Sequence, residues 1–178
     1  MDLLDFEGQD LYFDEHIPAE VDALINDASE LYGTPAAEEK LLKAFFLAPD
    51  NLTVLVALYR YYYYQHKYEE TLVIAEHALK FSGQRLGFPR DWRELNIDYL
   101  GAGAIKSMGM VRFYLIALKG AGYINLRLSN FVVAQDMLTK VMELDSSNRL
   151  NVSELLAVAN EYLLTNSEEY KNVTFLKP

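Results

Sequence analysis

The sequence has 178 residues, of which 51% are hydrophobic, with a net charge of −10 and no cysteine. This apolar content excludes wholesale disorder, and the missing cysteines exclude disulfides, thiolate metal ligands and a cysteine nucleophile. Because the first ten residues have neither the basic region nor the apolar core of a secretory signal, and no apolar run reaches the roughly eighteen residues of a membrane span, we expect a cytoplasmic protein without a membrane partner.

The first segment, residues 1–17, is an acidic-aromatic leader that ends at Pro18. Its apolar residues follow neither helical nor strand spacing. One interpretation is that the leader packs a few apolar side chains onto the helices that follow. The other is that it docks as a peptide into a groove of its own chain or of a neighbouring one.

Two helix pairs are predicted next, over about 18–51 and 52–83. Gly33 separates the helices of the first pair and Pro49 ends it. The second pair joins helices at Leu52–Tyr64 and at 68–81 across a tight turn, each with apolar residues at helical spacing. A shift of about 34 residues brings the apolar positions of one pair onto those of the other.

Residues 84–110 are predicted to form an inserted loop and helix. Gly83 and Gly87 should break the preceding helix, and Asp91 has the character of an N-cap for a helix that reaches about Ser107. The glycines at 101 and 103 would either allow a neighbouring helix to approach closely or break this helix.

A third helix pair over about 111–148 repeats the apolar pattern of the first two. A last helix, within 150–165, should cover the apolar end of the array. The tail, 166–178, is expected to be loose.

This recurrence resembles a tetratricopeptide repeat (TPR) protein. The resemblance implies an all-α fold, a right-handed superhelix of antiparallel helix pairs in a single domain over 18–165. The family prefers a small residue at the position of Gly122, where the first two pairs carry Ile25 and Tyr59. We therefore expect those two pairs to splay apart or to fill the gap with aromatic rings.

In TPR proteins the first helix of each pair lines the concave surface. The resemblance thus implies a groove that holds a peptide or helix of a client protein and that is acidic at one end, aromatic in the middle and basic at the other. Five tyrosines between 59 and 64 cannot share one face of a helix, so only some of them can line the groove. The candidate binding residues are Asn26, Arg60, Tyr63, Tyr64, Lys119, Tyr123, Leu126 and Arg127.

The charges are unevenly distributed, which leaves two alternatives open. Residues 1–39 hold twelve acids and no Lys or Arg, whereas 80–127 holds eight bases against three acids. The protein could therefore self-associate, for example as a homodimer, with the acidic N-terminus in its own or a neighbour's groove. Nucleic-acid binding through 80–127 is a remote alternative, because the acidic first repeat would oppose it and the bases form no continuous stripe.

Catalytic residues are hard to find in this chain. His16, His66 and His77 lack the spacing of a metal site, and no glycine-rich phosphate loop follows a strand. We therefore expect a non-enzymatic scaffold, adaptor or assembly factor without a cofactor. The whole chain is also similar to small TPR proteins encoded among bacterial nitrogen-fixation genes, which implies a nitrogenase-related protein or maturation factor as the client.

Overall fold

The computed structural model describes the backbone of residues 17–174 and the side chains of residues 17–165. This part of the chain contains helices and no strand, which confirms the predicted all-α class. Apart from Ile17, the leader predicted for residues 1–17 lies outside the described residues. The helices are α1 (Ala19–Glu30), α2 (Pro35–Leu47), α3 (Leu52–Tyr64), α4 (Tyr68–Leu86), the 3₁₀ helix η1 (Trp92–Glu94), α5 (Ile97–Arg127), α6 (Phe131–Leu144) and α7 (Ser153–Thr174).

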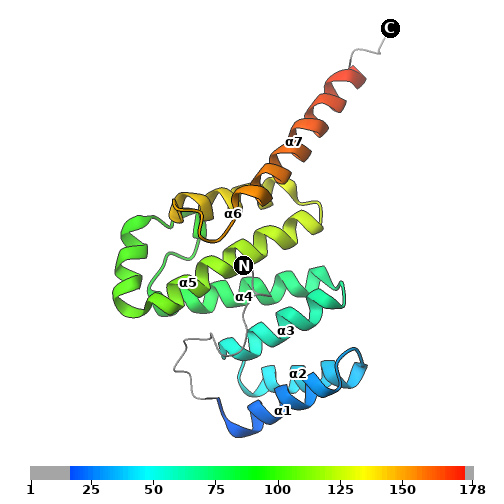
Figure 1. Ribbon diagram of the computed structural model, residues 1–178, viewed down its shortest axis with the longest axis vertical. Helices are drawn as coiled ribbons and strands as arrows, with labels where there is room; N and C mark the ends of the chain where they lie inside the picture. The colour runs from blue at the N-terminus through cyan, green and yellow to red at the C-terminus, as the bar shows by residue number, and fades with distance from the viewer. Residues whose placement is uncertain (1–16, 175–178) are drawn as a thin grey trace.

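The helices form a stack in chain order (Figure 1). Each α-helix packs against the next one along the chain, and α1 also touches α3. Most connections are only a few residues long, so successive helices run antiparallel. Among the described helices, none combines the length with the apolar content that a membrane crossing requires.

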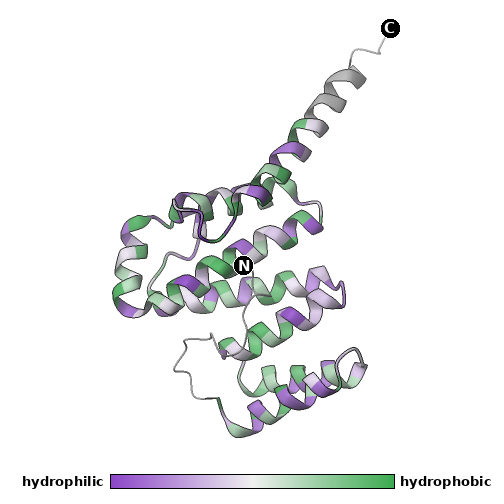
Figure 2. Ribbon diagram, viewed as in Figure 1, coloured by the Kyte–Doolittle hydropathy of each residue, from purple (hydrophilic) through white to green (hydrophobic). Residues whose placement is uncertain are grey.

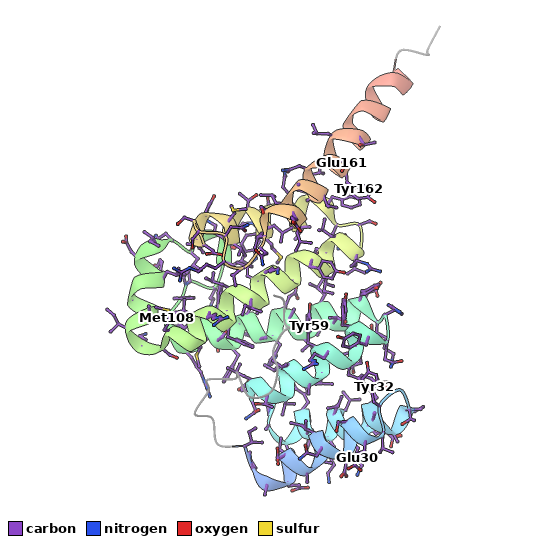
Figure 3. The ribbon with its side chains drawn as sticks, in the orientation of Figure 1. Glu30, Tyr32, Tyr59, Met108, Glu161 and Tyr162 are labelled. Carbon is purple, nitrogen blue, oxygen red and sulfur yellow. The ribbon has the colours of Figure 1, made fainter. Side chains whose placement is uncertain are left out.

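The buried core follows the stack from α1 to α7. Helix α3 lies inside the stack and is largely hydrophobic, whereas α1 at one end is mixed (Figure 2). Tyr59 is in the interior (Figure 3), with 1% of its surface exposed, and its ring is parallel to that of Tyr63 at a centroid distance of 6.4 Å. Tyr62 is also buried, as the helical spacing of the tyrosines predicts.

The start of α3 is fixed by its N-cap, Asn51. The side-chain oxygen of Asn51 accepts hydrogen bonds from the backbone N–H groups of Thr53 and Val54, at 3.0 and 3.2 Å. These bonds satisfy two donors that have no partner within the helix, and they explain why the predicted and observed starts of α3 agree.

Replacing Asn51 with alanine should lower the free energy of unfolding by about 1 kcal/mol, because both bonds are lost. Urea unfolding followed by circular dichroism would measure the change. Asn51→Asp keeps an acceptor at the cap and should cost far less; an equal loss in both variants would show that the cap bonds contribute little.

Helix α4 runs past the predicted break at Gly83 and ends at Gly87 instead. Gly83 is buried inside the helix, where a Cβ atom would lie 3.0 Å from the ring of Tyr114. Gly87 has a φ of 76°, a left-handed conformation that suits glycine at a helix end. The prediction was therefore wrong about Gly83, which allows close packing inside the helix, and right that the helix stops at Gly87.

The helix predicted from Asp91 to about Ser107 begins with the single turn η1, capped by Asp91, and continues as the first half of α5 from Ile97 to the kink at Ser107. The N-cap of α5 is Asn96, whose side chain accepts from the N–H groups of Asp98 and Tyr99. Helix α5 then continues to Arg127 across a kink at Ser107, where φ is −162° and ψ is 104°. The Ser107 hydroxyl oxygen accepts from Met110 N at 3.2 Å and thereby caps the second half of α5.

Helix α7 continues to Thr174, beyond residue 165 where the last helix was predicted to end. In Figure 1 its C-terminal half projects away from the stack. Its first turns pack on α6, where the rings of Phe131 and Tyr162 stack at a centroid distance of 4.7 Å.

Candidate functional site

A cavity of about 500 Å³ opens between α1, α2 and α3. Its base is formed by buried side chains of α1 and α2, Ala28 and Leu41. Ile25 also lines it, at the position where a small residue would have allowed closer packing. The lining residues are Ile25, Ala28, Ser29, Tyr32, Leu41, Ala57, Arg60, Tyr61 and Tyr64.

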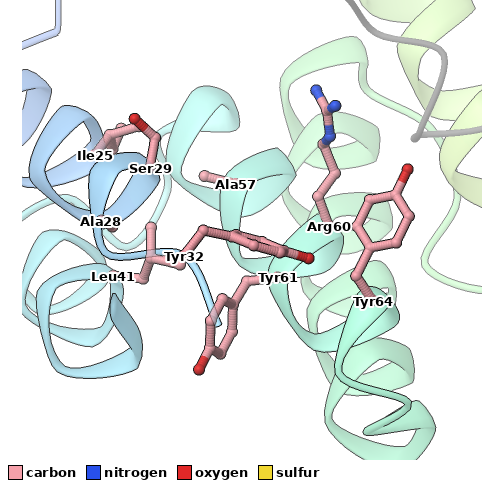
Figure 4. A pocket seen from close by; sticks show the side chains of 9 residues that line it. All are labelled: Ile25, Ala28, Ser29, Tyr32, Leu41, Ala57, Arg60, Tyr61 and Tyr64. Atoms are coloured by element: carbon pink, nitrogen blue, oxygen red, sulfur yellow. The ribbon is translucent and has the colours of Figure 1, made fainter. Parts of the chain in front are cut away.

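Three tyrosines surround this cavity (Figure 4). The ring of Tyr32, from the turn after α1, meets those of Tyr61 and Tyr64 edge to face at centroid distances of 6.1 and 6.5 Å. Tyr61 is buried and donates a hydrogen bond from its hydroxyl to the Thr34 carbonyl. Tyr32 and Tyr64 are about half exposed, so a partner can reach their rings.

Arg60 and Tyr64 point the same way from α3 at the edge of this cavity (Figure 4). Burial raises the pKa of the Tyr32 hydroxyl, and the neighbouring Tyr64 and Tyr61 raise it further. The Tyr32 phenol is therefore neutral at physiological pH and can donate a hydrogen bond. The cavity combines an apolar base, aromatic walls and one cation, a composition suited to an apolar side chain that carries a polar or anionic neighbour.

A second aromatic cluster continues this surface from α3 to α5. The hydroxyls of Tyr63 and Tyr123 are 3.1 Å apart, and Arg127 donates to the Tyr123 hydroxyl at 3.3 Å. The Arg127 guanidinium also lies over the ring of Tyr68, 4.7 Å from its centroid. The hydrogen bond to Tyr123 is the main cause of the raised pKa of Arg127.

His66, at the turn between α3 and α4, belongs to this cluster. Its side chain is exposed in the turn, and its Nδ1 is 3.0 Å from the Tyr68 hydroxyl. No three His, Asp or Glu side chains of the described part of the chain are grouped as metal ligands would be.

The structure divides the predicted binding residues among three environments. Arg60 and Tyr64 lie at the cavity, while Tyr63, Tyr123 and Arg127 belong to the second cluster. Asn26 is exposed on α1 and donates to Asp22 at 3.3 Å, and Leu126 is half-buried.

The structure contradicts the prediction that Lys119 lines the groove. Only 4% of its surface is exposed, because this part of α5 packs against both α4 and α6. Val56 on α3 and Ile116 on α5 are buried as well.

Tyr32 and Tyr61 line the cavity although neither was predicted as a binding residue. Tyr32 reaches the cavity because the turn that follows α1, with Gly33 at a φ of 84°, brings its ring against α3. Tyr61 follows Arg60 directly and was assigned neither to the core face of α3 nor to the face expected to line the groove. The glycine after Tyr32 was the available signal, since it marks a turn at the end of α1.

Comparison with curated proteins finds a relative that is 49% identical over 162 residues, which cover 91% of this chain and 90% of the relative. The relative is an uncharacterized 19.8 kDa protein in the nifW 5' region of Azotobacter chroococcum mcd 1. No protein-family model matches the chain, and no solved structure is significantly similar to it. The TPR resemblance therefore stays a prediction based on repeat spacing.

Proposed function

The chain belongs to the family of the 19.8 kDa protein in the nifW 5' region of Azotobacter chroococcum, and on that premise we propose that it is a binding scaffold for a nitrogen-fixation protein. The scaffold is a TPR-like array of helix pairs that holds a peptide or helix of its client. It acts without catalysis and without a cofactor. The observation that carries the proposal is the tyrosine-lined cavity between α1 and α3, with Arg60 at its edge.

Helix packing supports the repeat architecture. The pairs α1 with α2 and α3 with α4 are followed by the second half of α5 with α6, and the contact of α1 with α3 is the one expected between the first helices of adjacent repeats. In such an array the faces of α1, α3 and α5 form one continuous surface. The Tyr63–Tyr123 contact connects α3 to α5 on that surface.

Composition supports a protein partner rather than a small metabolite. Tyrosine and arginine are enriched among residues that dominate binding energy at protein interfaces. A tyrosine ring offers a large apolar area at a small entropic cost, because it has only two side-chain torsions. The cavity therefore suits an aromatic or aliphatic anchor of a client, with an acidic client residue near Arg60.

The test is an affinity capture from cells grown under nitrogen-fixing conditions, with Arg60→Ala, Tyr64→Ala or Arg127→Glu as bait variants. We expect a client that wild-type protein retains and that Tyr64→Ala retains about tenfold less, the loss of a single interface anchor. Quantitative mass spectrometry of the retained proteins measures this. All three variants should remain folded, as circular dichroism would show.

Tyr99→Ala is the matched control, because Tyr99 is similarly exposed but lies in the first half of α5, away from the cavity. It should retain the client as the wild type does. If all three groove variants also retain every protein at wild-type levels, the assigned surface is wrong.

A further inference from the structure

The surface formed by α3 and the second half of α5 carries only positive charges. Leu52–Tyr64 contains Arg60, and 111–127 contains Arg112, Lys119 and Arg127, while neither segment contains an Asp or Glu. The three cations of α5 are spaced seven and eight residues apart, which places them along one face of the helix. Arg112 and Arg127 are exposed on that face, whereas Lys119 between them is buried, so the two arginines and Arg60 supply the charge of the surface.

The N-terminal segment 1–16 is complementary to this surface. It contains six acids and no Lys or Arg, interspersed with leucine, phenylalanine and tyrosine. Its acids match the arginines of α3 and α5, and its apolar residues match the half-exposed ring of Tyr64 and the partly buried ring of Tyr123.

Charge also gives the direction in which this segment would turn. Helix α1, which follows it, holds Glu20, Asp22, Asp27 and Glu30 and no base. An anionic segment is repelled by α1 and attracted by the arginines beyond it. The face of α1 is therefore a poor site for residues 1–16, and the face of α3 and α5 is a good one.

The segment is long enough to reach that face. An extended chain of 16 residues spans about 50 Å. Two interhelical spacings, from α1 across α3 to α5, amount to about 20 Å. Ile17 packs against the core beside α1. The segment 1–16 therefore joins the stack at its α1 end.

We propose that residues 1–16 bind intramolecularly across the cationic, tyrosine-bearing face of α3 and α5 of their own chain. The tether supplies an effective concentration in the millimolar range, so a contact with a Kd of about 1 mM is already substantially occupied. The segment then shields this face and competes with any acidic partner for it. This inference does not depend on the client proposed above.

The test uses the full chain with Gly8→Cys carrying a nitroxide spin label, which is unique because the chain has no other cysteine. We expect the label to broaden the backbone amide signals of Arg112, Arg127 and Tyr64 far more than that of Val73 on α4. The broadening should fall by about half or more in 1 M salt, where the Debye length is about 3 Å.

Arg112→Glu with Arg127→Glu should weaken this broadening at low salt, whereas the matched pair Lys80→Glu with Arg90→Glu, on α4 and the following loop, should leave it unchanged. Arg112→Glu alone serves if the pair perturbs the Tyr123 cluster. The proposal would be overturned if the signals of α4 were broadened as much as those of α3 and α5. It would also be overturned if neither salt nor either pair of substitutions changed the broadening. Broadening that appears only between molecules, when spin-labelled protein is mixed with isotope-labelled protein lacking the spin label, would overturn it as well.

Discussion

Replacing Gly103 with alanine should lower the free energy of unfolding by about 2 kcal/mol, whereas the same change at Gly101, two residues earlier in α5, should raise it by up to about 1 kcal/mol. At Gly103 a Cβ atom would lie 2.7 and 2.9 Å from the Cε1 and Cζ atoms of Phe88 and 3.1 Å from a methyl group of Val111. At Gly101 it would meet nothing within 4 Å. From the sequence alone the two glycines are equivalent, and only the atoms that surround each of them in the structure distinguish the two positions.

Phe88 cannot easily move aside to accommodate the new methyl group. It is 8% exposed, and its ring meets that of Tyr114 edge to face at a centroid distance of 5.0 Å. The Phe88 ring is therefore held on two sides, by α5 at Gly103 and by the ring of Tyr114. Overpacking of this kind forces side chains out of their preferred rotamers and outweighs the helix propensity that alanine adds.

Urea unfolding of the two single variants gives the comparison. A double-mutant cycle with Phe88→Leu identifies the cause, because removing the ring edge should make Gly103→Ala less costly. Equal stability changes at Gly101 and Gly103 would contradict the account, and so would a cycle in which Phe88→Leu leaves the cost of Gly103→Ala unchanged.

Much of the fold was predictable because its signals are local. Gly33 as a turn residue and Pro49 as a helix stop act through their own backbone, so the bounds of α2 and the start of α3 could be inferred from neighbouring residues. Gly83 was expected to break α4 because glycine is a poor helix former. It lies inside the helix instead, because the ring of Tyr114, 31 positions away, fills the space beside it. That contact has no local signature.

The candidate site likewise contains residues that local spacing predicts and residues that only contacts between helices place there. Helical spacing placed Arg60 and Tyr64 on one face of α3, and both reach the cavity. The same spacing grouped Lys119 with Tyr123 and Arg127, but burial depends on the neighbours of α5 and not on its own periodicity. Tyr32 joins the site through a turn and a contact with another helix, which periodicity within one helix does not describe.

Raising the pH from about 10 to about 12 should remove roughly 2–3 kcal/mol of stability through Tyr114. Burial, with a smaller contribution from Asp91, raises the pKa of Tyr114 to about 12 in the folded protein. In the unfolded chain the pKa of a tyrosine is about 10. The folded state holds the proton more tightly, so the stabilisation is complete below about pH 10 and is lost as the pH rises through 12.

Tyr62 should contribute to the same alkaline transition. Burial and the nearby Glu38 raise its pKa to about 12 as well, so wild-type protein loses stability through both phenols over one pH range. Tyr114→Phe keeps the ring against Phe88 and removes the ionisable hydroxyl. The difference between wild type and Tyr114→Phe therefore isolates Tyr114, and Tyr62→Phe isolates the other contribution.

Urea unfolding at intervals from pH 8 to 12 measures the slopes, and absorbance at 295 nm follows ionisation of the tyrosines directly. If Tyr114→Phe lost as much stability as the wild type between pH 10 and 12, the buried phenol would not be the cause.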